Sequence, residues 1–147
     1  MTIKGKIVKK FQLIEQPPTL DDYLALRSES GLSPKSPEQG QGAIANSWYF
    51  CHLRDSDTGR AVAMGRVIGD GGWYFHIADM ATLPEFQGMG LGRKIIDNLI
   101  AKIRSSAPEN PYITLIADPP GRRLYEKVGF HEISPSRGMQ LPVQPTS

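Results

Sequence analysis

The sequence has one cysteine, little net charge and no long hydrophobic run. Cys51 stands alone among 147 residues, so no disulfide can form within the chain. It lies in the apolar run 48–51, where a small buried residue is a commoner role than a nucleophile. No segment approaches the length of a transmembrane helix, and residues 1–6 contain no apolar signal region. We therefore expect a reducing intracellular compartment, most simply the cytoplasm, and no membrane partner.

Charge of one sign is also lacking. Seventeen Lys and Arg residues oppose 15 Asp and Glu residues, which gives a net charge of +2. No run of basic residues is long enough to form a stripe, so we expect no nucleic-acid partner. Apolar residues make up 39% of the chain and charged residues 22%, which is typical of a globular protein. The length predicts one domain with one core over residues 1–147.

Local patterns predict an alternation of strands and helices. Thr19 is a helix N-cap with acidic residues in the following turn, and Pro37 is a favoured first helical residue. In residues 90–106, apolar side chains recur at helical spacing, which predicts an amphipathic helix. The expected strands are 7–14, 48–54, 60–68, 73–82, a buried strand at 112–117, and a last pair at 130–133 and 139–141. The expected helices are 19–30, one from 37, 90–106 and 122–127. This order predicts an α/β fold with a mixed sheet covered by helices.

A glycine-rich turn joins the strand at 73–82 to the helix at 90–106. Its glycines, Gly88, Gly90 and Gly92, leave the backbone bare, and the turn opens onto a helix N-terminus that favours phosphate. Arg93 and Lys94 oppose the helix dipole there, which makes sense if an anion lies nearby. The spacing fits neither the dinucleotide nor the Walker pattern. The glycines alone fit equally well a turn that binds nothing.

Two longer motifs carry a family resemblance. Gln87-Gly88-Met89-Gly90-Leu91-Gly92 is similar to the Gln/Arg-x-x-Gly-x-Gly/Ala signature of the GNAT superfamily of acyl-CoA-dependent N-acetyltransferases. Leu124-Tyr125-Glu126-Lys127-Val128-Gly129-Phe130 resembles that family's second signature. The resemblance is clear from about residue 61 to 130. It implies a mostly antiparallel central sheet that splays after its fourth strand and is flanked by helices.

The resemblance also implies functional roles. Acetyl-CoA would be the cosubstrate, with no metal. The strand end at Met80, Ala81 and Thr82 would bind the pantetheine arm. The pyrophosphate would be bound by the amides of Gln87, Gly88, Met89, Gly90, Leu91, Gly92 and Arg93. Tyr125 matches the tyrosine that protonates the departing thiolate, although an aromatic that packs the helix is the alternative.

The general base is less defined. Asp79 is the favoured residue, acting directly or through water, and His76, Glu85 and water alone are the alternatives. Strand alternation places Asp79 and His76 on opposite faces unless a bulge intervenes. Either residue could instead be structural. The family's Asn before the tyrosine helix is missing, because this chain has Asp118-Pro119-Pro120-Gly121 there.

The expected activity is transfer of an acetyl group to the primary amine of a small molecule. A protein or peptide N-acetyltransferase and a non-catalytic acyl-CoA-binding module are the alternatives. Several aromatic residues could line an acceptor pocket, although aromatic strands usually form core: Trp48, Tyr49, Trp73, Tyr74 and Phe75. Members of the family often pair through their sheets, so a homodimer is possible.

Overall fold

The computed structural model describes residues 2–3, 6–7 and 10–143. The chain forms two compact units, one that ends at Leu115 and one that begins at Ile116. Within the described residues, no helix is both long enough and apolar enough to span a membrane.

A mixed sheet organises the first unit. Its strand order is β3-β4-β5-β6-β7, and every neighbouring pair is antiparallel except the last, β6 with β7. The strands are β3 (Phe11–Ile14), β4 (Tyr49–Asp55), β5 (Ala61–Gly69), β6 (Tyr74–Thr82) and β7 (Tyr112–Leu115). A separate two-stranded ribbon pairs β1 (Thr2–Ile3) with β2 (Lys6–Ile7). The predicted α/β class with a mostly antiparallel sheet is confirmed.

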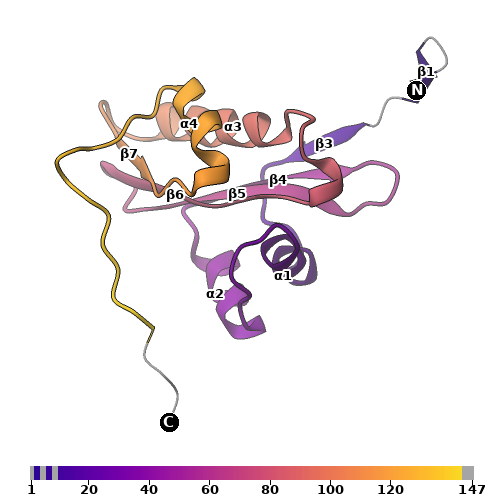
Figure 1. The fold of residues 1–147 in the computed structure, drawn as a ribbon, viewed down its shortest axis with the longest axis horizontal. Helices are drawn as coiled ribbons and strands as arrows, with labels where there is room; N and C mark the ends of the chain where they lie inside the picture. The colour runs from indigo at the N-terminus through magenta and orange to yellow at the C-terminus, as the bar shows by residue number, and fades with distance from the viewer. Residues whose placement is uncertain (1, 4–5, 8–9, 144–147) are drawn as a thin grey trace. The chain divides into compact units, whose positions relative to one another are not determined.

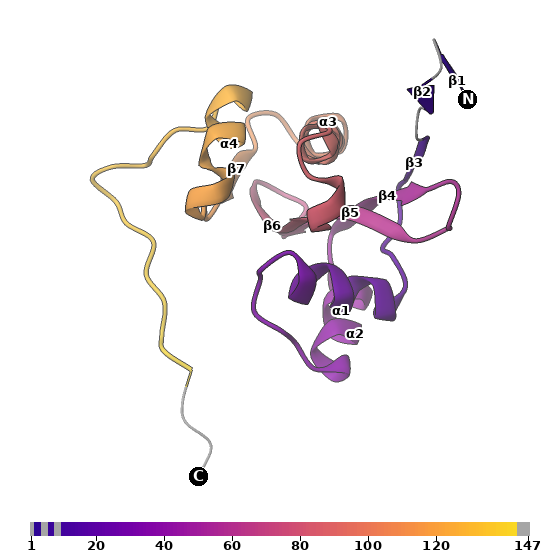
Figure 2. The same cartoon turned by 45° about the vertical axis from the view of Figure 1, so that its right-hand side comes forward.

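Helices cover both faces of this sheet. Figures 1 and 2 show α1 (Leu20–Glu29) and α2 (Pro37–Asn46) on one face and α3 (Leu91–Ser106) on the other. Thr19 caps α1 as predicted, because its hydroxyl accepts a hydrogen bond from the Asp22 amide. Ser36 and Gln39 form a reciprocal capping box at the start of α2. The amphipathic α3 buries Leu91, Ile95, Ile96, Leu99 and Ile103.

The second unit contains the 3-10 turn η2 (Pro119–Gly121) and the helix α4 (Arg122–Val128). Gly129 ends α4 with a left-handed φ of 119°, as the sequence predicts. Between residues 130 and 143 the structure contains no strand, so the predicted last pair of strands is wrong. Two strands of three or four residues form too few ladder bonds to be stable alone.

Two further expectations are corrected at the sheet edges. The predicted strand 7–14 is interrupted: Ile7 belongs to β2, residues 8–9 lie outside the described residues, and β3 begins at Phe11. The strand predicted as buried at 112–117 is the shorter β7, in which Tyr112 is exposed and the other residues are half-buried. β7 is the edge strand of the sheet, and an edge strand has a neighbour on one side only.

Candidate functional site

The sheet opens at the C-terminal end of β6. Parallel pairing with β7 runs from Tyr74 to Ile77 and stops there, whereas β6 continues to Thr82. On its other edge β6 stays paired with β5 as far as Thr82. The last residues of β6 therefore have one edge without a strand partner among the described residues. This is the splay that the family resemblance implies.

A β-bulge lies where the splay begins. Arg66 pairs with Ala78 and Met64 pairs with Ala81, so Gly65 opposes two residues of β6, Asp79 and Met80. Asp79 has a φ of 54°, in the left-handed region that non-glycine residues seldom adopt. A Cβ at Gly65 would lie 2.7 Å from the Met80 sulfur and from a methyl group of Ile95 on α3. The bulge therefore needs a glycine on the facing strand.

Backbone alternation shows which groups face the open edge. The Leu83 amide donates to the Val62 carbonyl on the β5 side, so the main-chain groups of Ala81 also face β5. Those of Met80 and Thr82 point to the open edge. The Thr82 carbonyl accepts a hydrogen bond from Nε2 of Gln87 at 3.1 Å. Gln87 thus ties the turn back to the strand end, a role that the motif alone does not reveal.

The turn that follows exposes its backbone. After η1 (Pro84–Phe86), Gly88 and Gly90 both adopt left-handed conformations, with φ of 80° and 79°. Gly90 is the N-cap of α3, and because glycine has no side chain to cap the helix, the amides of Leu91, Gly92 and Arg93 lack a partner within it. Nothing lies within 4 Å of the position that a Cβ would take at Gly88 or Gly90. These glycines are required by conformation, and the turn can accept an anion.

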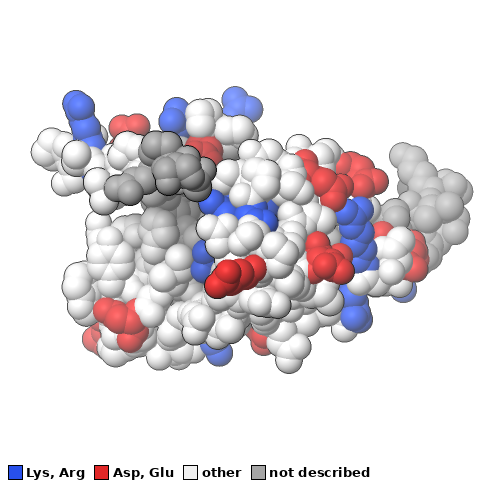
Figure 3. Space-filling model, turned by 90° about the horizontal axis from the view of Figure 1, so that it is seen from below, with Lys and Arg blue, Asp and Glu red and all other residues white. Residues whose placement is uncertain are grey.

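The cations beside the turn are only partly available. Nε of Arg93 donates to both carboxylate oxygens of Asp97 at 3.1 and 3.0 Å, an i,i+4 pair on the surface. Lys94 is exposed in the same turn of the helix. On the face that Figure 3 shows, Lys and Arg are scattered among Asp and Glu, with no continuous basic stripe among the described residues.

The carboxylate of Asp79 lies at the centre of a polar network. It accepts hydrogen bonds from the Tyr23 hydroxyl at 2.5 Å, from Nε of Arg66 at 2.7 Å, and from Nη1 of Arg27. Burial alone would raise the pKa of Asp79, but the Tyr23 hydrogen bond and the two guanidinium groups outweigh it and lower the pKa below its usual value. Burial, together with Asp79, raises the pKa of Tyr23 to about 12. At neutral pH the carboxylate is charged and the phenol is protonated.

Sequence reasoning missed the partners of Asp79. Tyr23 and Arg27 stand among the apolar residues of the first predicted helix, and both are buried. An arginine on the apolar stripe of a helix is the available signal, because such a cation requires a partner when buried. That partner comes from β6, 52 residues away in the sequence.

The bulge also changes the relation between His76 and Asp79. His76 pairs with Ile68, two residues from Arg66, so His76 and Arg66 point to the same face of the sheet. Asp79 binds Arg66 on that face as well. A bulge was the one condition under which Asp79 and His76 were expected to share a face, and the structure contains it: the extra residue resets the alternation.

The His76 ring is held by the neighbouring strand. Its Nδ1 lies 3.0 Å from the Thr114 hydroxyl oxygen, and that hydroxyl donates a long bond of 3.5 Å to the Phe75 carbonyl. This arrangement favours the tautomer with hydrogen on Nδ1 and a lone pair on Nε2. Burial and the positive charge of Arg66 lower the pKa of His76 below 6.5, so the ring is neutral at physiological pH.

Two other reactive side chains lie apart from the strand end. Glu85 is 65% exposed and faces Arg60 at 3.9 Å. Cys51 is fully buried, and burial and the charge of Glu15 raise the pKa of its thiol to about 12. The expectation that Cys51 is a small buried residue is confirmed.

Tyr125 belongs to the second unit. Its ring packs edge-on against Phe130 at 6.2 Å, and it lies over Gly121, where a Cβ would come within 2.8 Å of the ring. Burial and the charge of Asp118 raise the pKa of Tyr125, so the phenol keeps its proton at neutral pH. Nε of Arg122 donates to the Ala117 carbonyl at 3.2 Å.

The aromatic residues that could line an acceptor pocket separate into two groups. Phe75 and Tyr49 are buried, and Trp48 packs on Phe75 with ring centroids 4.9 Å apart. Trp73 and Tyr74 are exposed and pack edge-on with ring centroids 5.2 Å apart, and both contact Tyr112. The first group is core, as the commoner interpretation of aromatic strands predicts.

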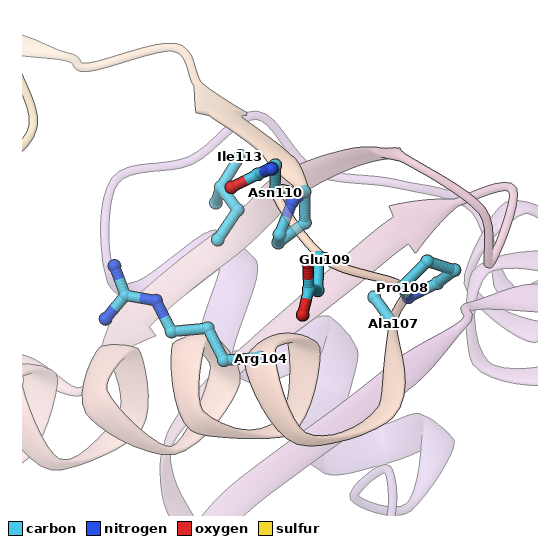
Figure 4. Close-up of a pocket in the computed structure, with 7 residues that line it drawn as sticks. Arg104, Ala107, Pro108, Glu109, Asn110 and Ile113 are labelled. Atoms are coloured by element: carbon cyan, nitrogen blue, oxygen red, sulfur yellow. The ribbon is translucent and has the colours of Figure 1, made fainter.

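A cavity of about 460 Å³ lies at the other end of α3. Figure 4 shows its lining by Arg104 of α3 and by the segment that leads into β7, including Glu109 and Asn110. None of the predicted site residues lines it. The sixteen residues of α3 separate it from the glycine turn by roughly 24 Å.

Comparison with known proteins adds to this geometry. The family profile described as "Acetyltransferase (GNAT) domain" matches residues 29–140. The crystal structure of a methicillin-resistant Staphylococcus aureus protein, described as a probable acetyltransferase of unknown function, has a TM-score of 0.84 and 38% sequence identity. That alignment covers 91% of this chain and 100% of the other.

Two curated relatives match over shorter stretches. An uncharacterized N-acetyltransferase of Porphyra purpurea is 40% identical over 76 residues, which cover 52% of this chain and 42% of that protein. The chloroplastic serotonin N-acetyltransferase 2 of Oryza sativa subsp. japonica is 37% identical over 75 residues, which cover 51% of this chain and 36% of that protein. The chain thus matches less than half the length of both.

The sheet, its splayed fourth long strand and the glycine turn form an acetyltransferase fold. Because the family profile covers most of the sequence, the chain belongs to the GNAT acetyltransferase domain family.

Proposed function

We propose that the protein is an acetyl-CoA-dependent N-acetyltransferase that acetylates the primary amine of a small molecule. The observation that supports this most is the turn at residues 87–92, where two left-handed glycines open an uncapped helix beside the edge of β6 that has no strand partner among the described residues. A pyrophosphate needs such free amides, and an extended pantetheine arm needs such a free strand edge. The profile match across 29–140 covers parts of both units, so residues 1–147 are one N-acetyltransferase domain in this proposal.

The donor binds along β6 and the turn. The main chain of Met80 and the amide of Thr82 are offered to the pantetheine arm, whereas Ala81 contributes only its small side chain, because its main chain faces β5. The amides from Gly88 to Arg93 surround the pyrophosphate; the Gln87 amide already donates to the Pro84 carbonyl, so Gln87 supports the turn through its side chain. A main-chain amide at the open edge also polarises the thioester carbonyl.

The reaction requires two proton transfers. The amine nitrogen attacks the thioester carbonyl, the carbon–sulfur bond breaks, and the CoA thiolate takes a proton from the hydroxyl of Tyr125. The amine must lose a proton, and Nε2 of His76 is the best-placed acceptor among the candidate bases. The ring is neutral, and within the described residues Nε2 makes no hydrogen bond. Asp79 is also part of the site, but each of its carboxylate oxygens already accepts a hydrogen bond, from Tyr23 or from Arg27.

The name of one relative favours a small-molecule acceptor: the rice protein is named a serotonin N-acetyltransferase, and serotonin is a small primary amine. A protein or peptide amine is the alternative acceptor, and a binding module without catalysis is the alternative function. The compartment remains a prediction: the single buried cysteine fits a reducing compartment such as the cytoplasm, and the rice relative is named chloroplastic. A homodimer also remains a prediction.

A panel assay tests the proposal. The protein is incubated with acetyl-CoA and with separate pools of aliphatic amines, aromatic amines and peptides, and thiol release is followed. Calorimetry measures CoA binding in parallel. We expect release with one small-amine pool. CoA binding without release above the hydrolysis rate would establish the binding module, and release with peptides alone would establish the protein acetyltransferase.

A further inference from the structure

We propose that Tyr23, Arg27 and Arg66 are positioning residues, which hold the bulge of β6 through the Asp79 carboxylate and so set the strand end that binds the donor. This inference rests on the proposed donor site. It assigns Asp79 a role different from that of a base, and it gives α1 a part in donor binding. No residue of α1 belongs to either sequence signature.

The bulge is the feature that needs support. Asp79 adopts a φ of 54°, where most side chains are disfavoured and only glycine, asparagine and aspartate are at all frequent. The next residue is Met80, whose main chain faces the open edge. If Asp79 relaxed to a negative φ, the direction of Met80 and Thr82 would change with it. The donor edge thus depends on one unfavourable backbone conformation.

Three side chains from two elements hold that conformation. Tyr23 and Arg27 reach Asp79 from α1, and Arg66 reaches it from β5. The two cations are themselves fixed: Arg27 donates to the carbonyl and the hydroxyl of Ser33, and Arg66 lies 3.3 Å from the Ser47 hydroxyl. The carboxylate cannot turn without breaking its bonds to α1 and to β5.

Burial makes these bonds strong. The side chain of Asp79 is 6% exposed, that of Arg27 is 10% exposed and that of Arg66 is 17% exposed. Charge-assisted hydrogen bonds in such surroundings are shorter and stronger than neutral ones. The carboxylate already accepts three hydrogen bonds and is almost fully buried, so a substrate amine has little access to it, and the two guanidinium groups make it a weak proton acceptor. The geometry favours an anchor over a base.

The test compares three substitutions that remove the same charge. Asp79→Gly, Asp79→Asn and Asp79→Ala all leave Arg27 and Arg66 without the carboxylate, so differences among them report the backbone. Glycine and asparagine tolerate a positive φ, and alanine does not. We expect CoA affinity by calorimetry to be roughly 5- to 30-fold weaker in Asp79→Ala than in Asp79→Gly, with Asp79→Asn between them. Hydrogen exchange of residues 80–82 should be fastest in Asp79→Ala.

Two outcomes would overturn the proposal. One is equal CoA affinity and equal exchange in all three variants. The other is an equal loss of kcat, 100-fold or more, in all three with wild-type CoA affinity, because that pattern identifies a base. Failure of the wild-type protein to bind CoA would instead remove the proposed function and is seen before any variant is made.

A milder variant tests the proposal even if the three Asp79 variants do not fold. Tyr23→Phe removes one hydrogen bond to Asp79 and keeps every charge in place. We expect a few-fold weaker CoA affinity and faster exchange at residues 80–82, with a Tm only a few degrees below the wild-type value. Glu29→Gln, which breaks only the exposed ion pair with Arg60, is the matched control and should change neither. Wild-type affinity and exchange in Tyr23→Phe would also overturn the proposal.

Discussion

A glycine can be required in the donor turn for its backbone conformation or for the close approach of a phosphate. Substitution of Gly90 distinguishes these two reasons. Its φ of 79° disfavours any other residue, whereas the space around it is open, with nothing within 4 Å of a Cβ. A left-handed conformation costs an alanine roughly 1–2 kcal/mol. Asparagine tolerates the same conformation much better, so Gly90→Asn is the matched control for Gly90→Ala.

The conformational cost of Gly90→Ala can appear as a loss of stability or as a loss of affinity for CoA. If the substituted turn keeps its shape, the free energy of unfolding falls by about 1–2 kcal/mol. If the turn relaxes in the free protein and must return when CoA binds, the Kd for CoA rises roughly 5- to 30-fold instead. We therefore expect the two losses in Gly90→Ala, measured by denaturant unfolding and by calorimetry, to add up to about 1–2 kcal/mol.

The comparison with Gly90→Asn decides the reasoning. A much smaller summed loss in Gly90→Asn would support the conformational explanation. A loss of CoA affinity that is equal in both variants, and larger than the conformational cost predicts, would show that the phosphate approaches the backbone too closely for any side chain. Wild-type stability and wild-type CoA affinity in Gly90→Ala would refute the assignment of this turn to the pyrophosphate.

Three further predictions concern other parts of the molecule. Gly65→Ala should lower the free energy of unfolding by about 1–3 kcal/mol, because its Cβ would overlap Met80 and Ile95, and an unchanged denaturation midpoint would contradict the packing described here. Tyr125→Phe should lower kcat while the Kd for CoA stays near the wild-type value, and an equal loss of both would make the residue structural. Burial and the charge of Arg66 lower the pKa of His76, so kcat/KM should fall only as the ring becomes protonated, on the acid side of the range of an unperturbed imidazole. His76→Gln should remove that acid limb, and a limb that persists would exclude His76 as the base.

Local signals predicted much of the fold. The structure confirms the helix starts predicted from Thr19 and Pro37 and the buried face predicted for α3. These features were predictable because caps and helical periodicity act over a few residues. The strand at 130–133 failed because strand formation depends on a partner, which no local pattern supplies.

The sequence predicted the part of the site that main-chain groups form, and it did not predict the contacts between its side chains. The glycine turn follows from residues 87–92 alone, because left-handed glycines and a helix start are local features. The position of Asp79 was visible, but its partners were not, since Tyr23 and Arg27 precede it by more than fifty residues. The bulge that brings His76 and Asp79 to one face depends on Gly65 in the adjacent strand.

The burial of Cys51 has a practical consequence. It is the only thiol of the chain, it is fully buried, and its pKa is about 12, so almost no thiolate exists at neutral pH. A thiol reagent that detects released CoA should therefore receive no signal from the folded protein. The same reagent should react with Cys51 only when β4 opens, so the slow labelling of this residue measures how often the central sheet comes apart.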